Sequence, residues 1–492
     1  MNGIGKKSLS GTFWLTFSNI VNLALSGGAL IYIARRLGPE SFGYVPLVAA
    51  IVGTSMIFAD VGLAPSTARF LAEAQGDRSK VWKLFKRSLG LRLMLLVPVC
   101  ACLYLVTGLL GRFLHAPLLP AFGWLMALLL FLLTMQLWIT KVCEGTGNVH
   151  VTAKVNLLVR WTEPALQILL VVAGFGLMGV FVGRAAAYIL SLGVFLTLMI
   201  RMFRAKEPPP SEAESTPTPS RILAYALPLM VIHASTLIYT QSDILMLKYF
   251  GGIEEVSYYG VATRMAHLIR VPAAAFGAST APLLMLLRRE SLERVQETIT
   301  KSLRYLAVAA VFVSAVVVIY AREIVEILFS ARYLSASTPL RLYTIFIFFS
   351  AFSAFVSLSL DYSGLAMRRM ILVAVSASCN VLLNLILIPR YGMMGAAYAT
   401  QITFSPLVAI YILLIAKHYR IACSRILGML LGIIGIGVIT CGVLYLCYRL
   451  LPQAIIFQIL GILIGGSLYL YIAARMNLVK KSELRTLYGR KR

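Results

Sequence analysis

Charged side chains are scarce in this sequence, and acidic side chains are the scarcest. Asp, Glu, Lys and Arg make up 13% of the 492 residues, and 19 acids stand against 45 Lys and Arg. Hydrophobic residues make up 59% of the chain, whereas soluble domains are roughly half apolar. This composition excludes an ordinary soluble domain. The apolar runs of about 18 to 25 residues instead predict helices that cross a membrane.

Motifs for catalysis and metal binding are also lacking. The seven cysteines show no CxxC or metal-ligand spacing and lie mostly in or beside apolar runs, so we expect packing roles and no disulfide. No HExxH, GxSxG or GxxxxGK[ST] motif occurs in a fitting context. We therefore expect no enzyme, no metal site, no cofactor and no nucleic-acid partner.

The apolar runs predict an all-α, polytopic membrane protein of about 14 transmembrane helices. To within several residues, the expected spans are 11–34, 43–63, 87–110, 118–140, 153–173, 177–200, 221–246, 256–280, 303–320, 338–360, 370–388, 393–416, 424–447 and 453–474. Lys and Arg gather in alternate connections, with 31 in one set and eight in the other. By the positive-inside rule, both termini and the segment between spans six and seven are expected in the cytoplasm.

Two halves of the chain repeat in sequence. Residues Glu144–Gly147 match Asp361–Gly364 at an offset of 217, and Gly176–Gly179 match Gly392–Gly395 at an offset of 216. They predict two six-helix lobes, 1–200 and 221–416, of the same orientation and with a cleft between them. A Pro-, Glu-, Ser- and Thr-rich cytoplasmic linker, 201–220, separates the lobes. Two extra helices and a basic cytoplasmic tail follow at 417–492.

Several stretches resemble a known family, the oligosaccharide and polysaccharide flippases of the superfamily that also holds multidrug and toxin extruders and lipid II flippases. The resemblance covers about residues 5–475. The stretches that carry it are RRLGPESFGYVPL (35–47), FADVGLAPSTARFLAE (58–73), QSDILMLKYFGGIEEVSYYGVATRM (241–265) and NVLLNLILIPRYGMMGAAYAT (380–400).

The resemblance implies a transporter of the cytoplasmic membrane that flips an oligosaccharide linked to polyprenyl pyrophosphate by alternating access. It implies lipid-linked oligosaccharide, membrane lipids and polysaccharide polymerases or glycosyltransferases as partners. The alternatives are a cation-coupled multidrug or toxin extruder and a membrane saccharide polymerase or ligase. The driving ion, a proton or sodium, stays open, as does the sugar.

Six basic residues lie inside the predicted spans, where an arginine near the bilayer centre costs about 2.5–3.5 kcal/mol. Arg92 and Arg341 lie near span ends, and we expect them to reach the interface. In span 256–280, Arg264, His267 and Arg270 share one face at 100° per residue. They predict a cationic site for an anionic headgroup. In the simpler interpretation, Arg264 pairs with Asp243 and Arg270 caps backbone near Pro272.

The remaining candidates lie on four other spans. Arg160 and Glu163 are three residues apart, close enough for an internal pair, and in the alternative Arg160 faces the cleft and binds the cargo. Arg184 has no acid nearby on its own span, which favours a cleft position in contact with the cargo. Asp243 is a possible partner of Arg264 or a coupling site. Asp60 is a second possible coupling site, although its place near a span end favours the interface. Among the aromatic residues, Tyr239, Tyr258 and Tyr259 are expected in an interfacial belt, with stacking on the sugars of the cargo as the alternative.

Overall fold

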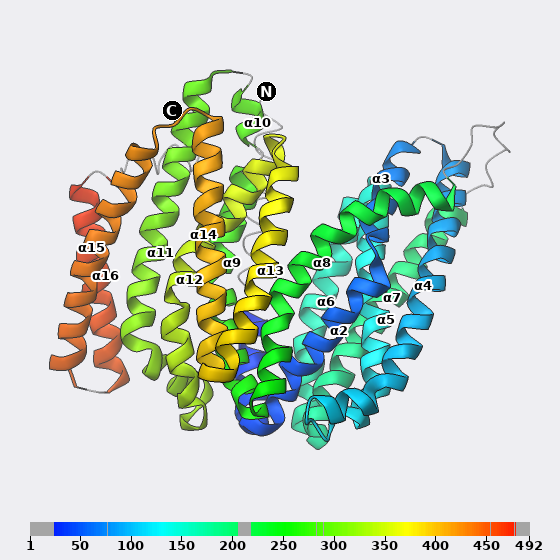
Figure 1. Ribbon diagram of the computed structural model, residues 1–492, viewed down its shortest axis with the longest axis horizontal. Coiled ribbons are helices and arrows are strands. Elements are labelled where there is room, and N and C mark those ends of the chain that lie inside the picture. Colours follow the sequence, from blue (N-terminus) through cyan, green and yellow to red (C-terminus); the bar gives the residue numbers. More distant parts are fainter. Residues whose placement is uncertain are drawn as a thin grey trace. The chain divides into compact units, whose positions relative to one another are not determined.

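The computed structural model describes residues 24–75, 77–204, 218–281, 283–288, 290–452, 454–476 and 478, and these are helices and their connections without any strand (Figure 1). A helix at Ala24–Phe42 comes first. The others are α2 (Tyr44–Asp60), α3 (Leu63–Glu73), α4 (Arg78–Phe113), α5 (Gly123–Gly145), α6 (Val149–Leu170), α7 (Gly176–Arg204), α8 (Pro219–Phe250), α9 (Ile253–Thr280), α10 (Leu283–Arg288), α11 (Leu292–Phe329), α12 (Ser337–Tyr362), α13 (Ala366–Tyr391), α14 (Met393–His418), α15 (Cys423–Leu450) and α16 (Ile455–Arg475).

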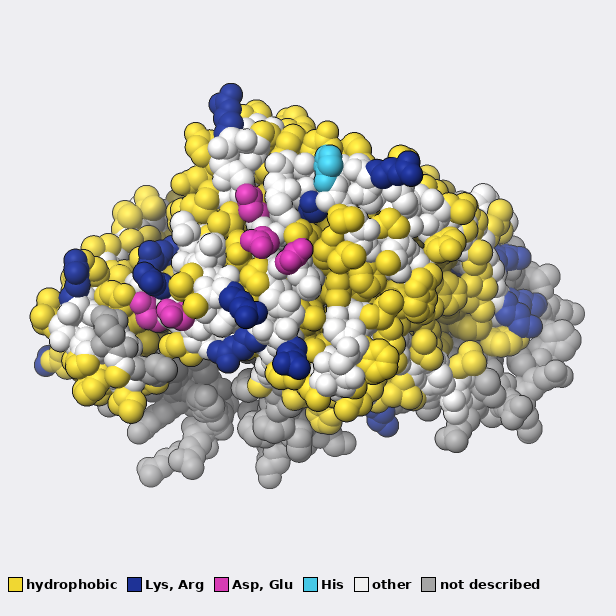
Figure 2. Space-filling view, turned by 90° about the horizontal axis from the view of Figure 1, so that it is seen from below, with side chains coloured by type: hydrophobic (Ala, Val, Ile, Leu, Met, Phe, Trp, Pro, Cys, Tyr) yellow, Lys and Arg dark blue, Asp and Glu magenta, His cyan; other side chains and the backbone are white. Residues whose placement is uncertain are grey.

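The predicted all-α membrane fold is confirmed. Within the described chain, nine helical segments are long and apolar enough to cross a membrane, or up to 11 if each of two bent pairs is one span. The count of about 14 differs at three places. The first two predicted spans form one bent pair, Ala24–Phe42 and Tyr44–Asp60. Helices α6 and α7 lie in one continuous segment, and α9 is not among the helices that are long and apolar enough to cross a membrane. Figure 2 views the molecule from below Figure 1, and on this face Lys, Arg, Asp and Glu side chains lie among hydrophobic ones.

The helices form two compact units. Unit 1 comprises residues 1–260 and 377–393, and unit 2 comprises 261–376 and 394–492. In this division α8, the start of α9 and residues 377–393, which include the second part of α13, belong to unit 1 rather than to the C-terminal half. The Ser66 hydroxyl donates to the Ile222 carbonyl at 3.0 Å, and Gly62, at φ +74°, lies so close to the Ala226 carbonyl that any side chain would clash with it. The predicted linker, 201–220, is only partly described: α7 continues to Arg204, α8 begins at Pro219, and 205–217 lie outside the described residues.

In unit 2, α11 is the helix around which the others pack. The core joins Leu303 and Val311 of α11 to residues of α12, α14 and α15. The two C-terminal helices attach to the same helix: Gly437 of α15 packs against the Val311 side chain, and the Tyr469 hydroxyl of α16 donates to the Val308 carbonyl at 2.8 Å. The last two helices are therefore an integral part of unit 2.

The sequence repeat has a structural counterpart at two turns. Gly147 after α5 has φ +77°, and Gly364 after α12 has φ +76°. In both turns the glycine N–H donates to the carbonyl three residues before it, and the next N–H donates to the carbonyl five residues before it. Gly176 and Gly392 likewise have φ values of +52° and +54°. Because these angles disfavour other residues, the matched glycines are explained by equivalent turns in the two halves.

Candidate functional site

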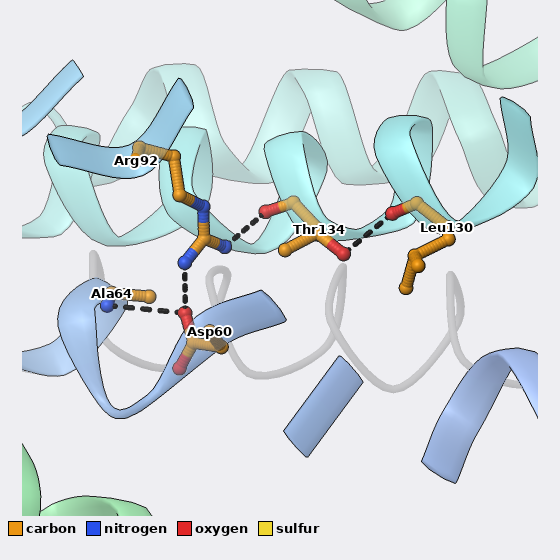
Figure 3. Close-up of polar contacts among 5 residues, drawn as sticks. All are labelled: Asp60, Ala64, Arg92, Leu130 and Thr134. Atoms are coloured by element: carbon orange, nitrogen blue, oxygen red, sulfur yellow. Dashed lines mark hydrogen bonds and ion pairs between the residues drawn. The ribbon is translucent and has the colours of Figure 1, made fainter. Parts of the chain in front are cut away.

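A buried ion pair fixes the bend between α2 and α3 (Figure 3). The Arg92 guanidinium of α4 donates to the Asp60 carboxylate at the end of α2 and, at 2.6 Å, to the Thr134 carbonyl of α5. The same Asp60 oxygen accepts the Ala64 N–H at 3.3 Å, which satisfies a donor in the first turn of α3. Arg92 is 0% and Asp60 is 1% exposed. One charge pair thus joins four helices of unit 1.

The interfacial positions predicted for Arg92 and Asp60 are wrong. The sequence placed both residues near span ends, where side chains reach water. In the structure, α4 extends from Arg78, well before the predicted start at 87, so Arg92 lies more than three turns inside the helix. At that depth the arginine needs a carboxylate partner, and the bend after Asp60 supplies one.

A second ion pair joins the α6–α7 hairpin. The Arg184 Nε lies 3.0 Å from the Glu163 carboxylate, and both side chains are partly buried at 26% and 21% exposed. The two helices approach closely, because a side chain at Gly183 would lie 2.8 Å from the Gln167 backbone nitrogen. Arg184 therefore has the acidic partner that its own span lacks, and its position in a cleft stays a prediction. Arg160 lies exposed on α6.

A polar network surrounds Asp243 in unit 1. Tyr259 donates its hydroxyl to Asp243 Oδ2 at 2.6 Å, and Asn384 of α13 donates to Asp243 Oδ1 at 2.7 Å. Asn384 also donates to Asn380 Oδ1 at 3.0 Å. Asp243 is 6% exposed and the two asparagines are 0% exposed. The buried Asn384 Oδ1 has no hydrogen-bond partner within the described chain.

Sequence reasoning missed two parts of this network. Tyr259 was expected at the membrane interface, but it is 1% exposed and bound to Asp243. The asparagines were noted only within a family-like stretch. Their spacing was a usable signal: residues four apart share a helix face, and two amides on one face of an apolar span imply buried polar partners. Asp243 and Arg264 lie in different units, and their pairing stays a prediction.

The three basic candidates of α9 lie together in unit 2. Arg264 and His267 are exposed, and Arg270 is partly buried. Both arginines are within electrostatic range of His267, whose ring packs edge-on against Phe346 of α12 with 5.7 Å between centroids. No ion pair or hydrogen bond to the Arg270 guanidinium is found among the described residues. Two arginines of α9 therefore lie near a histidine that packs against an aromatic ring of α12.

Arg270 also borders a cavity of about 280 Å³ between α9, α11 and α12. The walls are otherwise almost entirely apolar, and Tyr305 is the other lining residue with a polar side-chain group. A guanidinium in such surroundings has lost hydration without gaining a carboxylate. It is suited to bind an anion, since charge-assisted hydrogen bonds strengthen in a low dielectric.

Comparison with known proteins places the chain in a family. The model of the "Polysaccharide biosynthesis protein" family matches residues 8–288, which is more than half of the chain. The chain belongs to this family. A relative, the "Probable low-salt glycan biosynthesis flippase Agl15" of Haloferax volcanii, is 23% identical over 404 residues and covers 80% of either chain. The membrane protein MJ1068 of Methanocaldococcus jannaschii is 26% identical over 189 residues, 36% of either chain.

Solved structures of two other membrane transporters have the same fold as this chain. The lipid II flippase MurJ in an inward closed conformation has a TM-score of 0.74 at 15% identity and covers 94% of this chain and 98% of its own. An inward-facing multidrug resistance MATE family transporter of the MOP superfamily has a TM-score of 0.65 at 19% identity, covering 83% and 95%. At these identities the similarity establishes the fold, and the cargo is a separate question.

Proposed function

We propose that this protein is a flippase that carries a polyprenyl-pyrophosphate-linked oligosaccharide across the cell membrane by alternating access, for surface polysaccharide biosynthesis. The observation that carries the proposal is Arg270, a partly buried guanidinium with no ion pair in the described chain and with Arg264 and His267 beside it on α9. Such a site suits a pyrophosphate, whose oxygens accept the paired N–H groups of arginine. Membership of the polysaccharide biosynthesis family and the similarity to a relative named a flippase support the same function.

Transport of this kind needs no covalent chemistry, so no catalytic residue is assigned. We propose that a cation gradient supplies the driving force and that the Asp243 network is the coupling site. The Asp243 carboxylate can take up a proton, and together with the amide oxygens of Asn380 and Asn384 it offers the hard oxygen ligands that a sodium ion requires. Glycosyltransferases would supply the cargo, and a polysaccharide polymerase would consume it.

The deciding experiment is transport in proteoliposomes. The purified protein should move a lipid-linked oligosaccharide to the opposite leaflet, measured by access of an added glycosidase, and should not export a cationic dye. Export of the dye without movement of the saccharide would reverse the assignment in favour of a multidrug extruder. The proposed orientation, with both termini and the linker in the cytoplasm, is checked by reporter fusions. Fusions at Ser215 and after Arg485 should report cytoplasm, and one at Ser335 the exterior.

A further inference from the structure

The cavity beside Arg270 has two chemically different parts in immediate contact. The guanidinium lies at its border, and the next residues along α9, Pro272, Ala273 and Phe276, line it. Ala273 follows Arg270 by one helical turn, so charge and apolar wall are about 5 Å apart along the axis. A ligand for this site therefore needs an anionic group bonded almost directly to hydrocarbon.

Alanines leave room in the apolar part of the cavity. Ala309 of α11 is exposed and lines the cavity with Ala310 and Ala351, beside larger side chains such as those of Leu306, Val313 and Ile347. The space of about 280 Å³ is near the lower end of small-ligand sites. It is suited to one chain rather than to the two acyl chains of a phospholipid, whose phosphate is also held away from hydrocarbon by glycerol. A prenyl phosphate has a single chain attached at the phosphate oxygen.

We propose that the cavity between α9, α11 and α12 binds the first isoprene units of the polyprenyl carrier while Arg270 binds its phosphate. This inference rests on the proposed function for the identity of the cargo, and it adds a place for the lipid chain inside unit 2. Hydrocarbon on the apolar walls and phosphate on the guanidinium are recognised together, so the carrier is selected independently of its sugars.

A second cavity in the same unit provides the control. It lies between α11, α12 and α15, has a volume of about 230 Å³ and is lined by Val311, Thr344, Phe348 and Cys441 among others, with no charged side chain. Because it shares α11 and α12 with the first cavity but lacks a cation, filling it tests the general effect of adding bulk to unit 2.

The test is binding of farnesyl diphosphate to the purified full-length protein in nanodiscs, with farnesol, inorganic pyrophosphate and phosphatidylglycerol as comparison ligands. We expect farnesyl diphosphate to bind more tightly than all three. Arg270→Gln should weaken its binding about tenfold or more, through loss of the charge-assisted hydrogen bonds. Ala309→Phe, which fills the cavity from its open side, should weaken farnesyl diphosphate by a similar factor and leave pyrophosphate binding unchanged. Cys441→Phe should leave the binding of both farnesyl diphosphate and pyrophosphate unchanged.

Wild-type binding of farnesyl diphosphate by both Ala309→Phe and a second filling variant, Ala273→Leu, would overturn the proposal, as would equal binding of phosphatidylglycerol. Size-exclusion chromatography and thermal unfolding identify variants that fail to fold. The proposed function can fail separately. If the wild-type protein binds farnesyl diphosphate at Arg270 but moves no lipid-linked oligosaccharide, the binding site is supported and the flippase function is contradicted.

Discussion

Arg92 of α4 and Arg270 of α9 are arginines in apolar helices, yet their surroundings are opposite. Arg92 is 0% exposed and is held by Asp60 and the Thr134 carbonyl. Arg270 is partly buried, borders an apolar cavity and has no ion pair in the described chain. The charge of the first guanidinium is paired within the protein and, although its Nε has no hydrogen-bond partner in the described chain, its complete burial closes it to a ligand. The second needs an anion from outside, so only the second is a binding candidate.

The comparison is tested most strongly by removing one partner of the buried pair. Asp60→Asn leaves the Arg92 charge without a counter-charge, and loss of one partner in a buried ion pair costs about 3–5 kcal/mol. We expect loss of folded protein, measured by thermal unfolding and membrane abundance. Asp60→Leu combined with Arg92→Met, which removes both charges, should recover much of the stability.

Glu73→Gln is the matched control for that variant. It breaks the Arg69–Glu73 pair of α3, in which both side chains are about half exposed at 50% and 51%, so abundance should stay at the wild-type level. If Asp60→Asn is as stable as this control, the buried pair does not hold the α2–α3 bend, and the contrast with Arg270 loses its basis.

At Arg270 the expected effect is on transport rather than on folding. Arg270→Gln should reduce flipping about 10- to 100-fold, since charged hydrogen bonds contribute about 1.5–3 kcal/mol, while protein abundance is unchanged. Arg270→Lys should keep part of the activity because it retains the point charge and loses the planar fork. Wild-type transport by Arg270→Gln would make this arginine structural, like Arg92.

The sequence predicted the membrane class, the repeat and the basic face of α9, because these depend on local composition and spacing. Its errors concern which residue meets which across helices. Arg92 was assigned to the interface because α4 begins earlier than hydropathy indicates, in a basic segment that continues the helix. Arg184 was considered without Glu163 because the pair depends on the close α6–α7 approach at Gly183. Such pairings are tertiary, and helical periodicity alone carries no information about them.

Asp243 is a buried acid that accepts hydrogen bonds from the Tyr259 hydroxyl and the Asn384 amide, and it extends the comparison to carboxylates. If the network is the coupling site, Asp243→Asn should abolish the dependence of transport on a sodium or proton gradient and leave binding of farnesyl diphosphate intact. Transport driven at different ion gradients in proteoliposomes measures this. A variant that transports with unchanged ion dependence would assign Tyr259 and Asn384 a structural role. Non-additive losses in Asp243→Asn with Arg264→Gln would support their predicted pairing.

The pair of Arg184 and Glu163 is intermediate between Arg92 and Arg270. Like Arg92, Arg184 has an acidic partner, but like Arg270 it is only partly buried. Glu163→Gln should therefore destabilise the protein by only about 1 kcal/mol, which thermal unfolding can measure. Arg184 was predicted to contact cargo, and the reversed pair, Glu163→Arg with Arg184→Glu, separates the two roles. If Arg184 serves only its partner, the reversed pair keeps the attraction and should transport like the wild type. If transport is lost while the reversed pair remains as stable as the wild type, the position of the positive charge on α7 matters to the cargo, and Arg184 joins Arg270 as a binding residue.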